Sequence, residues 1–128
     1  MNRVLTLALV ALLALSSSAF CQSGQKKVKA AKVRSVIYLL KDGKVGGHIS
    51  YSGKRVWHED NDDGRFAFKE MGRDEWSVYL LKTDGAVIQL DLYQRKFFIY
   101  DGPLTKEQLR NLPVKSRRFL YTVAKAYH

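Results

Sequence analysis

Cysteine and proline are scarce in this 128-residue chain, which contains one cysteine and two prolines. The single cysteine, Cys21, excludes an intramolecular disulfide, although small secreted domains often depend on disulfides for stability. The chain also lacks an apolar run of the about 20 residues that a membrane-spanning helix needs. A hydrophobic core must therefore stabilise the fold, and aromatic residues, 12% of the chain, supply large side chains for it.

The usual sequence patterns of enzymes are missing as well. There is no Gly-x-Ser-x-Gly nucleophile turn, no histidine pair with metal-ligand spacing, and no glycine-rich phosphate loop before a helix. The sequence therefore favours a non-enzymatic protein without a cofactor, although catalysis is left open.

The N-terminal residues have the pattern of a signal peptide. One arginine, Arg3, precedes an apolar run over residues 4–15, and small residues follow at 16–19. We therefore predict a signal peptide over residues 1–21, with cleavage after Ala19 or Cys21, and a secreted or periplasmic protein. Lipidation of Cys21 is an alternative, but Ser18 and Phe20 do not fit the usual residues before a lipidated cysteine.

Charge is distributed unevenly along the chain, whose formal net charge is +10. Lysines and arginines dominate before residue 59 and after residue 101, whereas most acidic residues lie between them. Residues 22–32 are rich in lysine and poor in large apolar side chains, so we expect a flexible basic arm. This charge balance suggests a glycan or another anionic surface as the partner, with nucleic acid as an alternative.

Residues 33–128 are predicted to form a single, mostly β domain of the α+β class. Short apolar or alternating segments between residues 33 and 101 are separated by turn signals such as Asp42-Gly43 and Asp84-Gly85. They indicate about six or seven strands in an antiparallel meander, small barrel or sandwich. Thr105 and Gln108 have the spacing of a capping box, and apolar residues from Leu120 to Tyr127 recur at helical spacing, so a C-terminal helical segment is expected over 105–128.

One acidic segment, residues 59–70, resembles the calcium-binding loop of the EF-hand family. Oxygen ligands would come from Glu59, Asn61 and Asp63, with Gly64 at the turn and Glu70 as the closing carboxylate. This resemblance implies a calcium-tuned binding module. The first ligand in that family is almost always aspartate, whereas this segment begins with Glu59. The resemblance also implies a helix on each side of the loop.

Two further groups of residues are candidates for function. Aromatic and basic side chains suited to stacking and anion binding suggest a ligand-binding surface; this set contains Tyr51, Lys54, Arg55, Trp57, Arg73 and Tyr79. His58 beside Glu59, with Arg55 or Arg73 for phosphate, suggests the alternative of a small secreted hydrolase such as a ribonuclease. The leading hypothesis is an exported, non-enzymatic binding protein.

Overall fold

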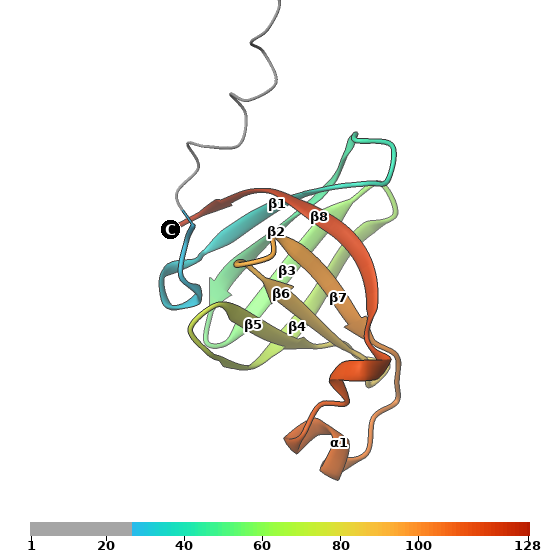
Figure 1. Ribbon diagram of the computed structural model, residues 1–128. Coiled ribbons are helices and arrows are strands. Elements are labelled where there is room, and N and C mark those ends of the chain that lie inside the picture. The colour runs from blue at the N-terminus through green and yellow to red at the C-terminus, as the bar shows by residue number, and fades with distance from the viewer. Residues whose placement is uncertain (1–26) are drawn as a thin grey trace, which may run out of the picture.

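The computed structural model describes residues 27–128, which form a closed barrel of eight antiparallel strands (Figure 1). Neighbours in the sequence are neighbours in the sheet, and the last strand pairs with the first. The strands are β1 (Ser35–Leu39), β2 (Val45–Gly53), β3 (Val56–Asn61), β4 (Gly64–Arg73), β5 (Ser77–Leu81), β6 (Val87–Asp91), β7 (Lys96–Tyr100) and β8 (Arg118–Tyr127). The prediction of a mostly β antiparallel fold is confirmed, and the barrel is the form it takes.

The alternation of side chains explains why these segments close around a core. Every second residue of a strand points inward, and most of the buried inward residues are apolar. Trp57, Ile49 and Leu90, for example, are fully buried. Short turns join the strands from β1 to β7. At the β2–β3 turn Lys54 and Arg55 both have positive φ, as a two-residue hairpin turn of matching twist requires. These buried side chains form the hydrophobic core of the barrel.

The C-terminal strand differs from the predicted helix. Residues 118–127 form β8, which pairs with both β1 and β7 and closes the barrel. Its inward residues Tyr121 and Val123 are two positions apart, and the Tyr121 ring stacks on that of Tyr38 with centroids 4.5 Å apart. The prediction of a helix here was wrong because apolar residues on both faces of this strand also matched a helical period. Pairing on both sides removes the two open edges that β1 and β7 would otherwise present.

The helical turn expected after residue 104 is confirmed. Helix α1 (Lys106–Arg110) begins with the predicted capping box, in which Thr105 and Gln108 exchange side-chain and main-chain hydrogen bonds. A short 3-10 turn, Val114–Ser116, follows and leads into β8. In Figure 1 this connection projects beyond the ends of β7 and β8.

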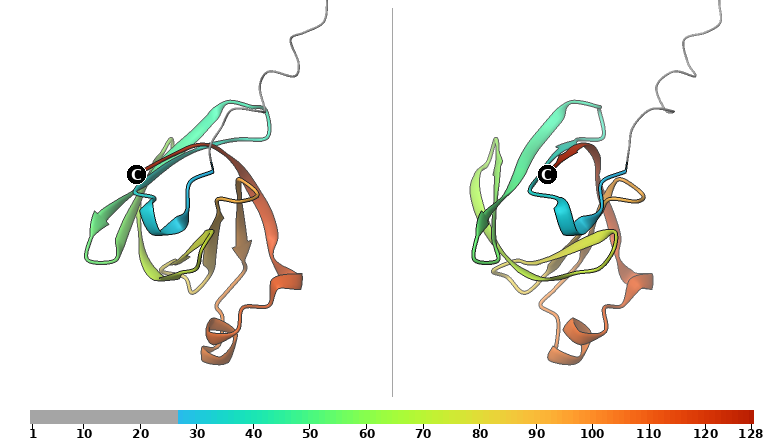
Figure 2. Two further views of the ribbon diagram at one scale, coloured as in Figure 1. Left: turned by 60° about the vertical axis from the view of Figure 1, so that its left-hand side comes forward. Right: turned by 90° about the vertical axis from the view of Figure 1, so that its left-hand side faces the viewer.

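The N-terminal segment covers one end of the barrel instead of forming the expected arm. A 3-10 turn, Ala30–Lys32, crosses that opening (Figure 2). Ala30 and Val33 are fully buried, and the Ala30 amide donates to the carbonyl of Glu75. Small and β-branched residues between the lysines make this packing possible, so the prediction of a flexible arm fails from residue 27 onward.

The predicted signal peptide, Cys21 and the first residues of the predicted arm lie outside the described part of the chain. Within residues 27–128, no helix has the length and apolar content needed to cross a membrane.

Candidate functional site

Three of the predicted ligand-binding residues, Tyr51, Trp57 and Arg73, meet at the covered end of the barrel. Trp57 donates from Nε1 to Glu70 at 2.9 Å, and the Arg73 guanidinium lies 2.8 Å from the same carboxylate. Arg73 also donates to the carbonyl oxygens of Ala30 and Val33. These contacts join the strands to the N-terminal segment, so we call Tyr51, Trp57, Glu70 and Arg73 the Arg73 cluster.

The electrostatics of the Arg73 cluster indicate a structural role. Burial by itself raises the pKa of Glu70, but the hydrogen bonds from Arg73 and Trp57 and the charge of Arg73 outweigh it and hold that pKa below its usual value. Both side chains of the ion pair are mostly buried, at 18% and 11% exposure. The polar groups bond to one another and to the main chain, which leaves little to offer a ligand.

The other predicted binding residues lie elsewhere. Lys54 and Arg55 are exposed in the β2–β3 turn, where Arg55 donates to the carbonyl of Met71. Tyr79 is on the outer surface of β5 and donates to Asp74 at 2.7 Å. Burial and this hydrogen bond to a carboxylate raise the pKa of Tyr79 to about 12. The predicted ligand-binding residues are therefore divided among the Arg73 cluster, the β2–β3 turn and the outer surface of β5.

Tyr79 belongs to a polar network on the outside of the barrel. Gln89 is the centre of this network, because its carbonyl accepts from Tyr100 and Arg117 and its amide donates to Ser77, each at 2.9 Å. A cleft of about 420 Å³ lies between this surface and the connection that contains α1. Since the network's side chains satisfy one another, it stabilises the packing of the connection without requiring a ligand.

The residues of the EF-hand-like segment are not brought together. Residues 59–70 span most of the β3–β4 hairpin, so Glu59 and Glu70 lie toward opposite ends of it. Glu59 accepts hydrogen bonds from Tyr38 and Asn61 inside the barrel, while the Asn61 carbonyl accepts from the main chain of Asp63. Among the described residues no group of three or more acidic, histidine or cysteine side chains could hold a metal ion. The alternation of Phe66 and Phe68 favoured strands over the helices that such a loop requires.

The histidine–carboxylate pair of the hydrolase hypothesis is divided by the sheet. Trp57 points inward, so its neighbour His58 points outward and contacts Ser52 through Nδ1 at 2.9 Å. Glu59 points inward again, toward Tyr38. Adjacent residues of one strand face opposite sides, and this pair cannot act on one substrate.

A different surface combines basic and aromatic side chains on the outside of β7, β8 and the neighbouring β6–β7 turn. Lysine ammonium groups lie over exposed aromatic rings in three places: Lys27 over Tyr93 at 3.4 Å, Lys125 over Tyr127 at 5.1 Å and Lys96 over Phe119 at 5.5 Å from the ring centroid. The three rings are 54%, 39% and 45% exposed, respectively. We call these six residues the β8 face.

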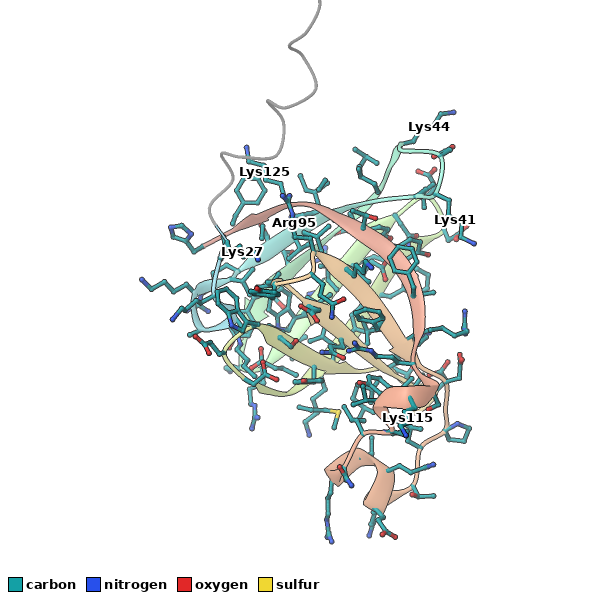
Figure 3. The ribbon with its side chains drawn as sticks, viewed as in Figure 1. Lys27, Lys41, Lys44, Arg95, Lys115 and Lys125 are labelled. Carbon is teal, nitrogen blue, oxygen red and sulfur yellow. The ribbon has the colours of Figure 1, made fainter. Side chains whose placement is uncertain are left out.

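Further basic side chains extend the β8 face. Arg95 donates to the carbonyl of Ala124, beside Lys125, and the labelled residues of Figure 3 show both near Lys27 at the covered end of the barrel. Lys41 and Lys44 lie in the β1–β2 turn, and Lys115 precedes β8. No salt bridge within residues 27–128 involves Lys27, Lys41, Lys44, Arg95, Lys96, Lys115 or Lys125. Their charges are therefore available to an external anion.

Sequence reasoning missed the β8 face because it depended on reading residues 118–127 as a strand. Lys125 and Tyr127 are two positions apart, on either side of inward-facing Ala126, and this spacing was the available signal. Tyr93 and Lys27 are far apart in the sequence, and no spacing could have joined them. Comparison with known proteins found no matching family model, curated protein or solved structure.

Proposed function

We propose that the protein is exported and binds an acidic glycan through the β8 face, without catalysing a reaction. The observation that carries this proposal is the repeated pairing of a lysine with an exposed aromatic ring on one side of the barrel. A sugar ring stacks on an aromatic face, and a neighbouring ammonium group pairs with its carboxylate or sulfate.

The extent of the β8 face favours a polymer over a small anion. Phe119 and Tyr127 are at the two ends of β8, about 26 Å apart at the usual rise of about 3.3 Å per residue. Positive charge at the covered end of the barrel comes from Lys27, Arg95 and Lys125. Further positive charge comes from Lys41 and Lys44 in the turn between the neighbouring strands β1 and β2. Several repeating acidic units would contact such a surface at once, which strengthens weak individual contacts.

The acidic side chains are concentrated away from this surface. Five of them lie on β3, β4 and the β4–β5 turn, which are at least three strands from β8 in the barrel: Glu59, Asp60, Glu70, Asp74 and Glu75. Glu59 and Glu70 bond inside the barrel, and Asp60 and Glu75 pair with Arg65 and Lys29. These carboxylates therefore do not offset the charges of the β8 lysines, which attract an anionic partner.

The test is a titration of the protein with polygalacturonate, with neutral dextran as the uncharged polymer. We expect binding to polygalacturonate that weakens steeply as salt rises, and none to dextran. Lys125→Glu should reduce affinity about tenfold at low salt, whereas Lys106→Glu, the same charge change on α1, should leave it nearly unchanged. Equal losses in both variants would mean that net charge alone, and not this surface, is responsible.

The aromatic rings are tested separately. Phe119→Ala should reduce affinity about threefold to tenfold even where salt screens the charges, because ring stacking does not depend on ionic strength. Single-stranded DNA and anionic lipid vesicles serve as competitors. Tighter binding to either than to the polysaccharide would overturn the choice of a glycan.

A further inference from the structure

One strand of the barrel is longer than the neighbour that should cover its edge. The pairing of β4 with β5 begins at Lys69, opposite Leu81, so residues 64–68 pair with β3 alone. After Leu81 the chain turns away, and the Lys82 amide donates to Ala86 within that turn. The free side of residues 64–68 is called the β4 edge below.

The hydrogen-bonding direction identifies the groups that are left over. The amide of Glu70 donates to the carbonyl of Arg55 on the β3 side, so alternate residues counted back from Glu70 also bond toward β3. The residues between them, Ala67 and Arg65, turn their N–H and C=O groups the other way. Neither has a ladder partner on that side within the described chain. These groups have the pattern that an additional strand requires.

Hollows lie on both faces of the β4 edge. The outer one, of about 490 Å³, is lined by Lys54, Val56 and Leu81. The inner one, of about 350 Å³, is lined by Glu59 and by Phe66, which is 43% exposed. Ala67, Phe68, Lys82 and Thr83 line both hollows, so the two meet at the gap between β4 and the β5–β6 turn. A strand in this gap would place alternate side chains in the two hollows.

The charges around the gap indicate what such a strand contains. Four basic side chains and one acidic side chain line the hollows: Lys54, Arg65, Lys69 and Lys82 against Glu59. Arg65 and Lys82 have nearby aspartates at 3.8 and 3.6 Å, whereas no described salt bridge involves Lys54 or Lys69. A second copy of this edge would bring the same basic residues against each other, which disfavours self-pairing.

We propose that the β4 edge binds an acidic peptide segment in extended conformation, as a strand added beside Ala67 and Arg65. The peptide's main chain bonds to the free groups of these two residues, its carboxylates face Lys54 and Lys69, and an apolar side chain contacts Phe66. β4 is four strands from β8 in the eight-strand order, so this site is separate from the β8 face and does not depend on glycan binding.

The test uses amide hydrogen exchange of the full protein with a capped peptide of alternating glutamate and valine. In the free protein, the Ala67 amide should exchange faster than the Phe68 amide, which bonds to β3. Saturating peptide should slow exchange at Ala67 and Arg65 about tenfold or more. Fast exchange that persists at both amides, or slow exchange at Ala67 in the free protein, overturns the proposal.

Variants separate the main-chain contacts from the charges. Ala67→Pro removes the donor at an edge where proline is tolerated, and should abolish peptide binding while the barrel stays folded; Ala67→Val, which keeps the donor, should bind. Lys69→Glu should weaken binding about tenfold and favour a peptide of alternating lysine and valine. Equal affinity of the native protein for both peptides would overturn the assignment of an acidic partner. If slower exchange at Ala67 and Arg65 appears on raising the protein concentration without peptide, the added strand comes from a second copy of the chain, and the peptide proposal is wrong.

Discussion

Arg73, near the end of β4, donates a hydrogen bond to the main-chain carbonyl of Ala30, 43 positions earlier in the chain. The same guanidinium pairs with Glu70 and lies over the ring of Trp57. The Arg73 side chain therefore connects the barrel wall to the segment that covers its end. From the sequence, Arg73 was predicted to bind an anionic ligand.

Arg73→Met should destabilise the protein by about 3 kcal/mol, because it leaves the Glu70 carboxylate mostly buried without its cation. Chemical denaturation measures this change. Replacing Arg118, whose ion pair with Asp101 is largely exposed, should have a much smaller effect. The double variant Glu70→Gln, Arg73→Met should recover part of the loss, since no lone charge remains. A loss as large as that of Arg73→Met alone would contradict this account of the pair.

The lowered pKa of Glu70 predicts a loss of stability in acid. Its folded-state pKa is below the usual 4.5, so its contribution is fully present above that value and disappears as pH falls through the folded-state pKa. Denaturation midpoints measured from pH 7 down to about pH 3 should fall less steeply in Glu70→Gln than in the native protein. Parallel curves would show that Glu70 is not among the carboxylates responsible.

Tyr79 should titrate later than an ordinary tyrosine. Its pKa of about 12 lies above the usual 10, so its contribution to stability is present below pH 10 and disappears as pH rises through about 12. Ultraviolet titration of the native protein against Tyr79→Phe isolates this group. In Asp74→Asn the transition should move toward 10, because a neutral amide no longer stabilises the protonated hydroxyl; an unchanged transition would assign the shift to burial alone.

Gly47 should not tolerate a side chain. A Cβ there would lie 2.6 Å from the Tyr38 hydroxyl oxygen and 2.8 Å from the Asp60 carbonyl oxygen, so Gly47→Ala should cost about 1–3 kcal/mol. Gly72→Ala is the matched control, because a Cβ at Gly72 has no neighbour within 4 Å. Similar thermal midpoints for both variants would mean that Tyr38 moves aside at little cost.

The sequence predicted strands wherever the local pattern had only one interpretation. Asp42-Gly43 and Asp84-Gly85 lie in the turns they indicated, and Thr105 caps α1 as expected. Residues 118–127 were ambiguous, because their apolar side chains fit both a helix and a strand with two contact faces. Pairing with β1 and β7 decides between these structures, and those partners are distant in the sequence.

The candidate sites depended even more on tertiary structure. Trp57 and Arg73 looked like binding residues, but inward orientation made them part of the core and of its covered end. Lys27 reaches Tyr93 only because the N-terminal segment crosses the barrel opening. Residue type and spacing do not specify which side chains meet when the contacting residues are far apart in the sequence.

By itself, the chain's order of apolar residues and turns determined an antiparallel sheet, since alternation and tight turns act between neighbours in the sequence. Closure of the barrel, the covering of one end and the exposed edge of β4 were decided by how strands of unequal length pair across the whole molecule. Those features set which side chains remain free to bind, and they arise only when segments that are distant in the sequence pair with one another.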